Sequence, residues 1–218
     1  MIKKMFSWLN MRIGAKFNRF QRNHLKKRLR KQAIDTNISI ISQNCIGGVM
    51  YHELGLKFCS PTINIYIEAE DFIKFCENMQ HYLSIEAKSL RFVKERSYPV
   101  GYLDDIKIYF VHYTSEEEAI KKWEERRKRI NYKKICIVMT DRDGFNKEIL
   151  HRFSSLKYKK ILFASRNYSN KDVIFMPCFK RQQCVGGLTA YCNVFGKRYY
   201  RKYFDIIKWL TEWSNETV

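Results

Sequence analysis

The sequence predicts an α/β protein: three layers, with a mainly parallel, Rossmann-like sheet and one antiparallel hairpin. Short β-branched apolar runs alternate with longer segments in which apolar residues recur every three or four positions, as in strand–helix–strand units. One run, KKICIVMT at 133–140, is apolar throughout after its two lysines, which is typical of a central strand covered on both faces. We expect an N-terminal arm over 1–34 and an α/β domain over 35–218.

The arm is defined by its charge. The chain carries a net charge of +19, and residues 1–31 contain eleven Lys and Arg with no acidic residue before Asp35. Apolar residues recur there at roughly helical spacing: Met5, Trp8, Leu9, Ile13, Phe17 and Phe20. We expect a basic amphipathic helix that either lies on anionic lipid of the inner leaflet or packs on the domain. Gly14 weakens a single continuous helix.

The expected cellular location follows from the composition of the N-terminal segment. Charges interrupt it every few residues, so it has no apolar core of a signal peptide, and no run reaches the ~18 apolar residues of a spanning helix. We therefore expect a cytoplasmic protein, peripheral to the inner membrane. The basic arm is also compatible with nucleic acid, but no nucleic-acid-binding motif occurs, so that partner is the less favoured one.

Within the domain, strands are predicted from apolar runs and helices from periodicity. The expected strands are 37–42, 60–67, 98–103, 106–113, 133–140, 159–165 and 172–179. The expected helices are 49–54, 68–83, 114–131, 146–156 and 199–213. The strands at 98–103 and 106–113 form the hairpin around Asp104-Asp105. The helix at 114–131 has acids at its start and bases at its end, and Thr114 or Ser115 caps it.

The seven cysteines are interpreted as free thiols. They include no CxxC pair, and several, such as Cys136, lie inside apolar runs. This usage is typical of a reducing compartment, and the spacing predicts no metal site.

Candidate ligand-binding residues lie in four loops that follow predicted strands, because ligands of open α/β sheets bind beyond the carboxyl ends of the strands. These loops are 43–48, 141–144, 165–167 and 180–183, with Gly186-Gly187 close behind the last.

In the first loop, Cys45 precedes a short helix, whose dipole would stabilise a thiolate. Three interpretations stay open: Cys45 is a nucleophile with His52 as its partner, Asn44, Cys45, Gly47 and Gly48 form an anion-binding nest, or the loop is only a tight turn.

Two further sets of charged residues are candidates. Asp141 ends a buried strand, where a carboxylate is costly unless it is paired or functional, so Asp141 is a candidate orienting carboxylate or base. An Asp-Gly turn that caps the next helix is the alternative. Basic residues could hold an anionic ligand or simply be solvated: Arg126, Arg129, Arg142, Lys180 and Arg181, together with Asp143.

These segments resemble a bacterial domain of unknown function that is usually labelled exopolysaccharide or capsule biosynthesis protein. The resemblance lies in NCIGGVMYHELGLKFCSPTIN, EDFIKFCENMQHYL, PVGYLDDIKIYFVHYTSEEEAIKKWEERRKRIN and MTDRDGF. It covers residues 36–165 and extends toward YFDIIKWL, with the basic arm outside it. It implies an α/β fold and a role in surface polysaccharide, and it assigns no catalytic residue.

The sequence therefore leads to two functional hypotheses. The first is an acyl or glycosyl transferase of surface-polysaccharide assembly, with a nucleotide-sugar or acyl-CoA donor and a lipid-linked glycan. In it, Cys45 attacks or lines the pocket, His52 or His112 transfers protons, and Asp141 orients them. The alternative is a non-catalytic, membrane-associated module that binds a phosphorylated ligand.

Overall fold

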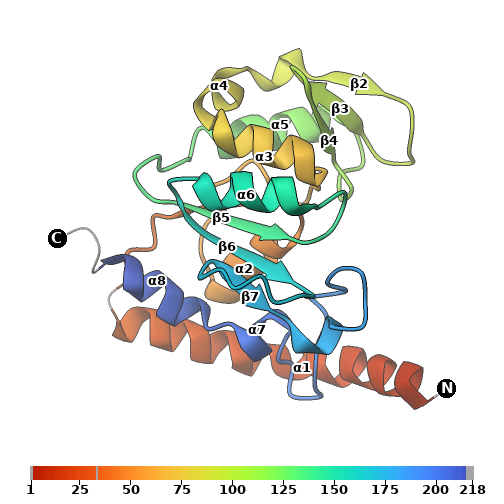
Figure 1. Ribbon diagram of the computed structural model, residues 1–218, viewed down its shortest axis with the longest axis vertical. Coiled ribbons are helices and arrows are strands. Elements are labelled where there is room, and N and C mark those ends of the chain that lie inside the picture. Colours follow the sequence, from red (N-terminus) through yellow and green to blue (C-terminus); the bar gives the residue numbers. More distant parts are fainter. Residues whose placement is uncertain (1, 33, 215–218) are drawn as a thin grey trace.

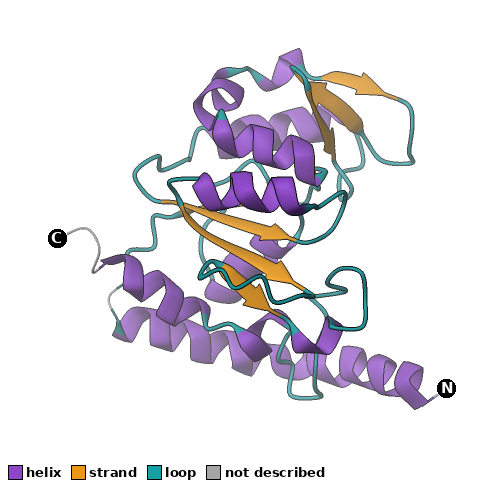
Figure 2. Ribbon diagram, viewed as in Figure 1, coloured by secondary structure: helices purple, strands orange, loops and turns teal. Residues whose placement is uncertain are grey.

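A computed structural model of the chain describes residues 2–32 and 34–214, and it has the predicted α/β architecture (Figures 1 and 2). The main sheet has four parallel strands in the order β1-β5-β6-β7. These are β1 (Ser39–Ser42), β5 (Ile135–Thr140), β6 (Lys159–Ala164) and β7 (Val173–Phe175). The predicted central strand, β5, is fully buried and pairs with β1 and β6.

A separate antiparallel sheet lies at the far end of the molecule from the N-terminal helix (Figure 1). Its strands are β2 (Arg91–Val93), β3 (Val100–Leu103) and β4 (Ile106–Tyr109), in that order. The hairpin β3–β4 is confirmed, and Asp104 takes a positive φ of 57° in its turn. Strand β2 was not predicted, because only three residues pair and none of them is fully buried.

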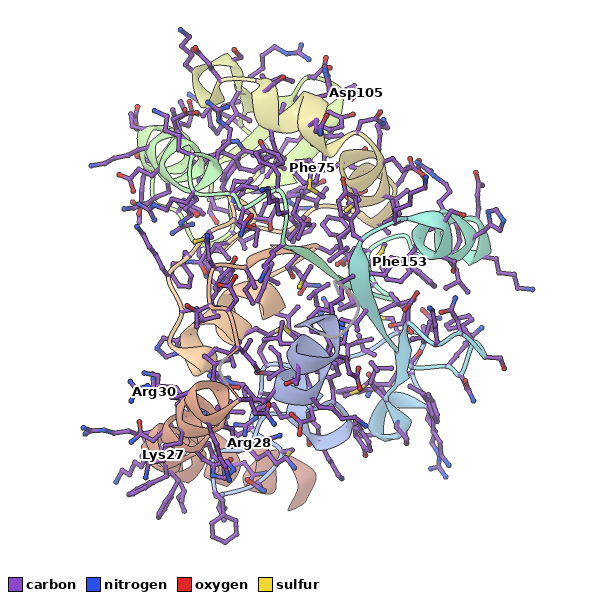
Figure 3. The ribbon with its side chains drawn as sticks, turned by 90° about the vertical axis from the view of Figure 1, so that its left-hand side faces the viewer. Lys27, Arg28, Arg30, Phe75, Asp105 and Phe153 are labelled. Carbon is purple, nitrogen blue, oxygen red and sulfur yellow. The ribbon has the colours of Figure 1, made fainter. Side chains whose placement is uncertain are left out.

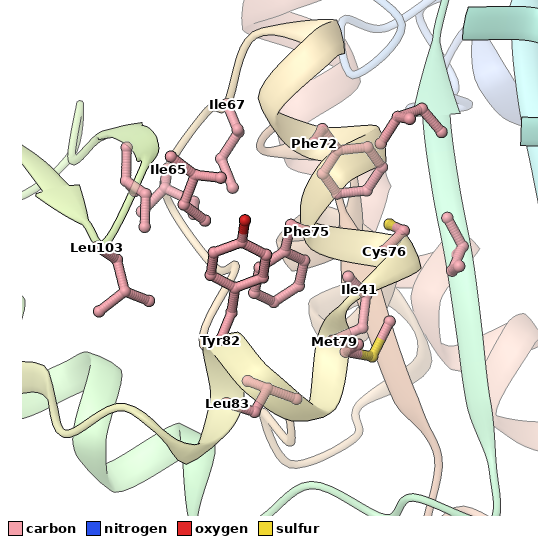
Figure 4. Packing of buried hydrophobic residues seen from close by; sticks show 14 of the residues in the cluster. Ile41, Ile65, Ile67, Phe72, Phe75, Cys76, Met79, Tyr82, Leu83 and Leu103 are labelled. Carbon is pink, nitrogen blue, oxygen red and sulfur yellow. The ribbon is translucent and has the colours of Figure 1, made fainter. Parts of the chain in front are cut away.

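Helices cover both faces of the main sheet, since adjacent strand residues point to opposite sides. Ile41 faces a core with α3 (Ala69–Glu77), α4 (Met79–Ser84), α5 (Glu116–Arg127) and α6 (Lys147–Ser155). In Figure 4, Phe72, Phe75 and Met79 pack near Ile41 in this core. Ile40 faces the second core, which is covered by α1 (Ile2–Lys31), α2 (Ile46–Leu54) and α8 (Ile206–Ser214). The remaining elements are the short helices η1 (Ala87–Ser89), η2 (Pro177–Phe179) and α7 (Tyr200–Tyr203).

The predicted strand at 60–67 is wrong. Ile63, Ile65 and Ile67 alternate inward as in a strand, yet only Tyr66 pairs, with Tyr109. The backbone turns instead at Asn64, which has a φ of 63°. Local hydrogen bonds replace the ladder nearby, including Thr62 N to Ser60 Oγ.

Two predicted helices are each broken in two. Helix 68–83 ends and restarts at Asn78, whose φ of −116° is not helical. Helix 199–213 breaks at Phe204, which is extended, and Asp205 then accepts from the backbone N–H of Ile207 and Lys208 as the cap of α8.

Helix α1 is continuous through Gly14, contrary to the prediction of a weak point. A Cβ at Gly14 would lie 3.0 Å from the carbonyl oxygen of Asn193 and 3.1 Å from the ring of Tyr191, so the glycine lets the C-terminal segment approach the helix. Leu25 and Leu29 of α1 are buried in the second core. The arm is therefore packed on the domain along part of its length. Within the described residues, every helix is too short or too polar to span a bilayer.

A buried carboxylate joins α1, α2 and the C-terminal segment. Glu53 of α2 is fully buried and accepts from Asn18 Nδ2 at 3.0 Å, Arg198 Nε at 3.0 Å and Tyr200 OH at 2.5 Å. Arg201 lies 3.9 Å from the same carboxylate. The irregular segment after β7 is thus held against the two helices by one charge network.

Candidate functional site

A pocket of about 390 Å³ lies at the carboxyl edge of the main sheet, the side toward which the β5 and β6 arrows point in Figure 1. It is lined by Asn44, Cys45, Ile46, Tyr66, Val111, Thr140, Arg142, Asp143, Gly186, Gly187, Leu188 and Thr189. The four strands follow chain order across the sheet, so no reversal of strand order creates this pocket. One wall comes instead from the long connection between β1 and β5, which contributes Tyr66 and Val111.

The floor of the pocket is a hydrogen-bonded amide and hydroxyl network between β1 and β5. The buried Gln43 accepts from Thr140 N at 2.9 Å and from Thr140 Oγ1 at 2.8 Å. Asn44 Nδ2 donates to Thr140 Oγ1 at 3.0 Å. These bonds fix the ends of two adjacent strands, so the polar groups on the floor are held in place before any ligand arrives.

Asp141 lies outside the pocket lining, and its carboxylate is fully used in hydrogen bonds to neighbouring segments. One carboxylate oxygen accepts from both Ser165 N and Ser165 Oγ at 2.7 Å, and the other accepts from Val185 N at 2.7 Å. The carboxylate thereby ties β5, β6 and the loop that carries Gly186 and Gly187 together. Its prediction as an orienter of a histidine has no support here, because no histidine in the described part of the chain hydrogen-bonds to it.

Arg142 and Asp143 are the charged residues that line the pocket. Arg142 is partly exposed, and its only ion pair among the described residues is a long one of 3.9 Å to Asp143. Burial raises the pKa of Asp143, although Arg142 beside it acts in the opposite direction. The backbone of Asp143 has a φ of 54°, an unusual value for a residue with a side chain. A half-buried carboxylate with a raised pKa beside a partly exposed guanidinium is a combination found in functional sites.

Cys45 lines the pocket but does not have the surroundings of an activated thiol. Burial raises its pKa, with smaller opposing effects from its own backbone and Arg142. The first two amides of α2 are already bonded, since Ile46 N donates to Asn44 Oδ1 and Gly47 N donates to Ser42 Oγ. These bonds do not favour an open anion nest at this turn, which stays a prediction, and the structure does not favour the thiolate expected at a helix start.

We expect Cys45 to react slowly with iodoacetamide at neutral pH and faster as the pH rises, because only the thiolate is nucleophilic. Cys178, which is exposed, serves as the internal comparison. Mass spectrometry of the partly alkylated protein should show label at Cys178 before Cys45. Label at Cys45 first would restore the interpretation of an activated nucleophile.

The two candidate histidines lie apart from Cys45. His52 is near the end of α2, where its Nε2 is 2.8 Å from Arg22 of α1. Desolvation and the nearby Arg22 lower its pKa. His112 is exposed, next to the pocket residue Val111 but outside the lining. Neither histidine forms the predicted pair with Cys45.

The glycines of the first loop are packing residues inside α2. A Cβ at Gly47 would lie 2.5 Å from the Cβ of Ser42, and one at Gly48 would lie 3.3 Å from the side chain of Ile63. Gly47 lets α2 approach β1, and Gly48 lets it approach Ile63, so packing accounts for both glycines. Their role in binding a ligand stays a prediction.

Most of the basic residues predicted to bind a ligand lie outside the pocket. Arg126 is buried and donates to the carbonyl of Ile63 and the hydroxyl of Tyr113, which accounts for its conformation without a ligand. Arg129 bonds to the carbonyl of Phe58. Lys180 and Arg181 are exposed and outside the pocket lining. Of the predicted site, the structure brings together Asn44, Cys45, Arg142 and Asp143.

Sequence reasoning missed Thr140, Tyr66 and Thr189, which also line the pocket. Thr140 is the last residue of a predicted strand, and this position at the carboxyl end of the strand could have indicated that Thr140 lines the site. Tyr66 lay in a segment misread as a strand, and its ring stacks on Tyr109 at 4.2 Å. Gly186 and Gly187 also line the pocket, although the sequence places them only near the fourth loop.

A larger hollow of about 660 Å³ lies at the amino end of β6 and against α8. Its charged groups are mostly paired already: Lys160 with Asp172 at 3.2 Å, Lys208 with Glu212 at 3.9 Å, and Asp205 with Arg28 at 2.7 Å. The described residues contain no group of three or more His, Cys, Asp or Glu side chains suited to a metal ion. The carboxyl-edge pocket is therefore the better candidate.

The fold and the pocket together define a three-layer α/β protein with a small polar pocket at the carboxyl edge of its parallel sheet. The chain belongs to the family described as Domain of unknown function (DUF1919), which matches residues 16–211. It is 35% identical over 201 residues to an uncharacterized protein of Haemophilus influenzae, covering 91% of this chain and 96% of that protein. The match begins inside α1, so the family includes part of the arm that we placed outside the resemblance. Exopolysaccharide or capsule biosynthesis stays a prediction.

Proposed function

We propose that this protein is a transferase of surface-polysaccharide assembly that binds a sugar derivative with an anionic group in the carboxyl-edge pocket. The observation that carries the proposal is the pair Arg142 and Asp143 on the wall of a polar pocket. On the floor, Asn44 is held in place by its hydrogen bond to Thr140 and offers a fixed amide group for sugar hydroxyls. The volume of about 390 Å³ suits a sugar phosphate rather than a whole nucleotide-sugar or acyl-CoA, whose remainder would lie outside.

The chemistry assigned to the two charged residues is specific. Arg142 holds the phosphate of the donor and the negative charge that develops on it. Asp143 accepts the proton of the acceptor hydroxyl as that oxygen bonds to the anomeric carbon. The bond from the anomeric carbon to the phosphate oxygen breaks, and its electron pair leaves with the phosphate. In this scheme Asp143 replaces His52 and His112 as the base, and Cys45 is a wall of the pocket.

Two observations favour the alternative, a non-catalytic module for a phosphorylated ligand. The raised pKa of Cys45 and the fully bonded carboxylate of Asp141 argue against these residues as the nucleophile and the orienting group first expected. Binding by Arg142 is common to both functions, so the two differ only in whether turnover occurs.

Arg142→Ala should abolish binding of the pocket ligand. The first measurement is a thermal-shift screen of the wild type with sugar phosphates, nucleotide-sugars and acyl-CoAs. Arg166→Ala is the matched control, because Arg166 is an exposed arginine after the neighbouring strand and outside the pocket. A ligand that stabilises both variants as well as the wild type would contradict this site.

Asp143→Asn separates the two functions once a ligand is known. A transferase should keep binding and lose at least about 100-fold in turnover, the usual contribution of a general base. Because burial raises the pKa of Asp143 and the base must be ionised, the rate should fall on the acidic side at a higher pH than an ordinary aspartate would give. Binding without any turnover in the wild type would favour the module.

A further inference from the structure

The outer face of α1 combines exposed aromatic rings with unpaired positive charges. Phe17 and Phe20 are 43% and 70% exposed, and their ring centres lie 6.2 Å apart. They share one face of the helix with Ile13, since the three residues follow an i, i+4, i+7 spacing. The side of α1 that packs on the domain is a different one, carrying Asn18, Leu25 and Leu29. The rings of Phe17 and Phe20 therefore lie away from the side of α1 that packs on the domain.

A second segment of the chain adds a third ring to this face. Phe195 is 63% exposed, and its ring centre lies 6.5 Å from that of Phe17. The turn that presents it is held by the next residue, Gly196, whose carbonyl accepts from Asn18. Gly196 has a φ of 75°, and a Cβ there would lie 2.5 Å from the backbone of α1. Two segments far apart in the sequence are thus built so that exposed phenylalanines meet.

Basic residues border the aromatic face on its other side. Arg12, Lys16 and Arg19 repeat the spacing of Ile13, Phe17 and Phe20 one position earlier, so they form the adjacent row. Lys27 and Arg30 extend that row, and Figure 3 shows both on the outer side of α1. In the described part of the chain, Lys16, Arg19, Lys27 and Arg30 are exposed and take part in no ion pair, and α1 contains no acidic residue.

We propose that this face, made of Phe17, Phe20, Phe195 and the adjacent row of bases, docks on an anionic lipid bilayer. The rings enter the boundary between headgroups and acyl chains, and the bases contact the anionic headgroups. A protein partner is less favoured, because the patch is a narrow aromatic strip beside a dense row of charge, and a flat anionic surface satisfies both at once. Duplex nucleic acid would contact the row of bases but leave the rings of three phenylalanines without a role. Single-stranded nucleic acid could stack on these rings, so it is one arm of the test.

The docking surface is separate from the pocket, so it stands whether or not the proposed transfer reaction occurs. It also has a geometric consequence. The loop that carries Phe195 begins at the pocket residue Thr189, whose carbonyl accepts from Arg198. In Figure 1 the N-terminal half of α1 extends toward the same side as the carboxyl edge of the main sheet. Docking would bring the pocket toward the membrane surface, where a lipid-linked substrate lies.

The test is sedimentation of the full chain with three probes: vesicles of phosphatidylcholine, the same vesicles with phosphatidylglycerol, and a single-stranded RNA oligonucleotide. We expect binding to the vesicles with phosphatidylglycerol, little binding to phosphatidylcholine alone, and weakening by salt. Phe17→Ser, Phe20→Ser and Phe195→Ser should each weaken vesicle binding about tenfold. Lys16→Gln and Lys27→Gln should each weaken it about fivefold.

Matched variants elsewhere on the surface separate docking from general effects. Tyr132→Ser replaces another exposed aromatic residue, and Lys121→Gln and Lys147→Gln remove the same charge from other helices. These three should bind vesicles as the wild type does. No vesicle binding by the wild type, equal losses in the control variants, or binding to RNA alone through the same bases would overturn the proposal.

Discussion

Replacing Glu53 by alanine is expected to lower the free energy of unfolding by about 3–5 kcal/mol, measured by urea titration. The fully buried carboxylate of Glu53 is the shared acceptor for Asn18, Arg198 and Tyr200, and it faces the positive charge of Arg201. Removing it leaves two guanidinium groups without their counter-charge inside the protein. The loss should exceed that of the hydrogen bonds alone, because an unpaired buried charge is costly.

Two variants sharpen this expectation. Glu53→Gln keeps an acceptor without the charge and should cost less than Glu53→Ala. Glu212→Ala removes an exposed carboxylate 3.9 Å from Lys208 and should change the free energy of unfolding by no more than about 0.5 kcal/mol. If Glu53→Ala unfolds at the same urea concentration as Glu212→Ala, the network does not hold the C-terminal segment in place.

The elements that the sequence predicted correctly are those in which local pattern and tertiary environment agree. Strand β5 is apolar up to its last residue, Thr140, because both of its faces are covered. Helix α5 begins after its cap, Ser115, because the Ser115 side chain accepts from Glu118 N. Segment 60–67 shows the opposite case. Its isoleucines alternate into the core, but local hydrogen bonds and the turn at Asn64 override the pattern.

Part of the candidate site could be predicted from the sequence, and part could not, for a related reason. The carboxyl ends of parallel strands meet at one edge, so Asn44 and Arg142 could be placed together from the sequence. Gln43, by contrast, is bonded to Thr140 across two strands, a contact between residues 97 positions apart. Gly47 and Arg126 were also predicted to bind a ligand, whereas the contacts of both residues are accounted for by packing inside the protein. Only the tertiary contacts separate these roles.

Asp141→Ala is expected to lower the free energy of unfolding by about 3 kcal/mol or more. Its carboxylate accepts hydrogen bonds from Ser165 N, Ser165 Oγ and Val185 N, all buried. Each buried donor that loses its acceptor costs about 1–3 kcal/mol. The loop with Gly186 and Gly187 should loosen at the same time, so ligand binding at the pocket should weaken along with stability.

The hydrogen bonds that Asp141 accepts from Ser165 and Val185 act as a structural clamp between β5, β6 and the loop at 185–187. The amide variant distinguishes this clamp from the catalytic role first expected of Asp141. Asp141→Asn places an NH₂ group where a carboxylate oxygen accepts from a buried donor, so it should be destabilised almost as much as Asp141→Ala. A catalytic orienting residue would give a protein as stable as the wild type that binds its ligand without turnover. Asp35→Ala, which removes an exposed partner of Lys134, should cost no more than about 1 kcal/mol. A stable, binding-competent Asp141→Asn protein would contradict the clamp, because the buried N–H groups of Ser165 and Val185 have no other acceptor in the described chain.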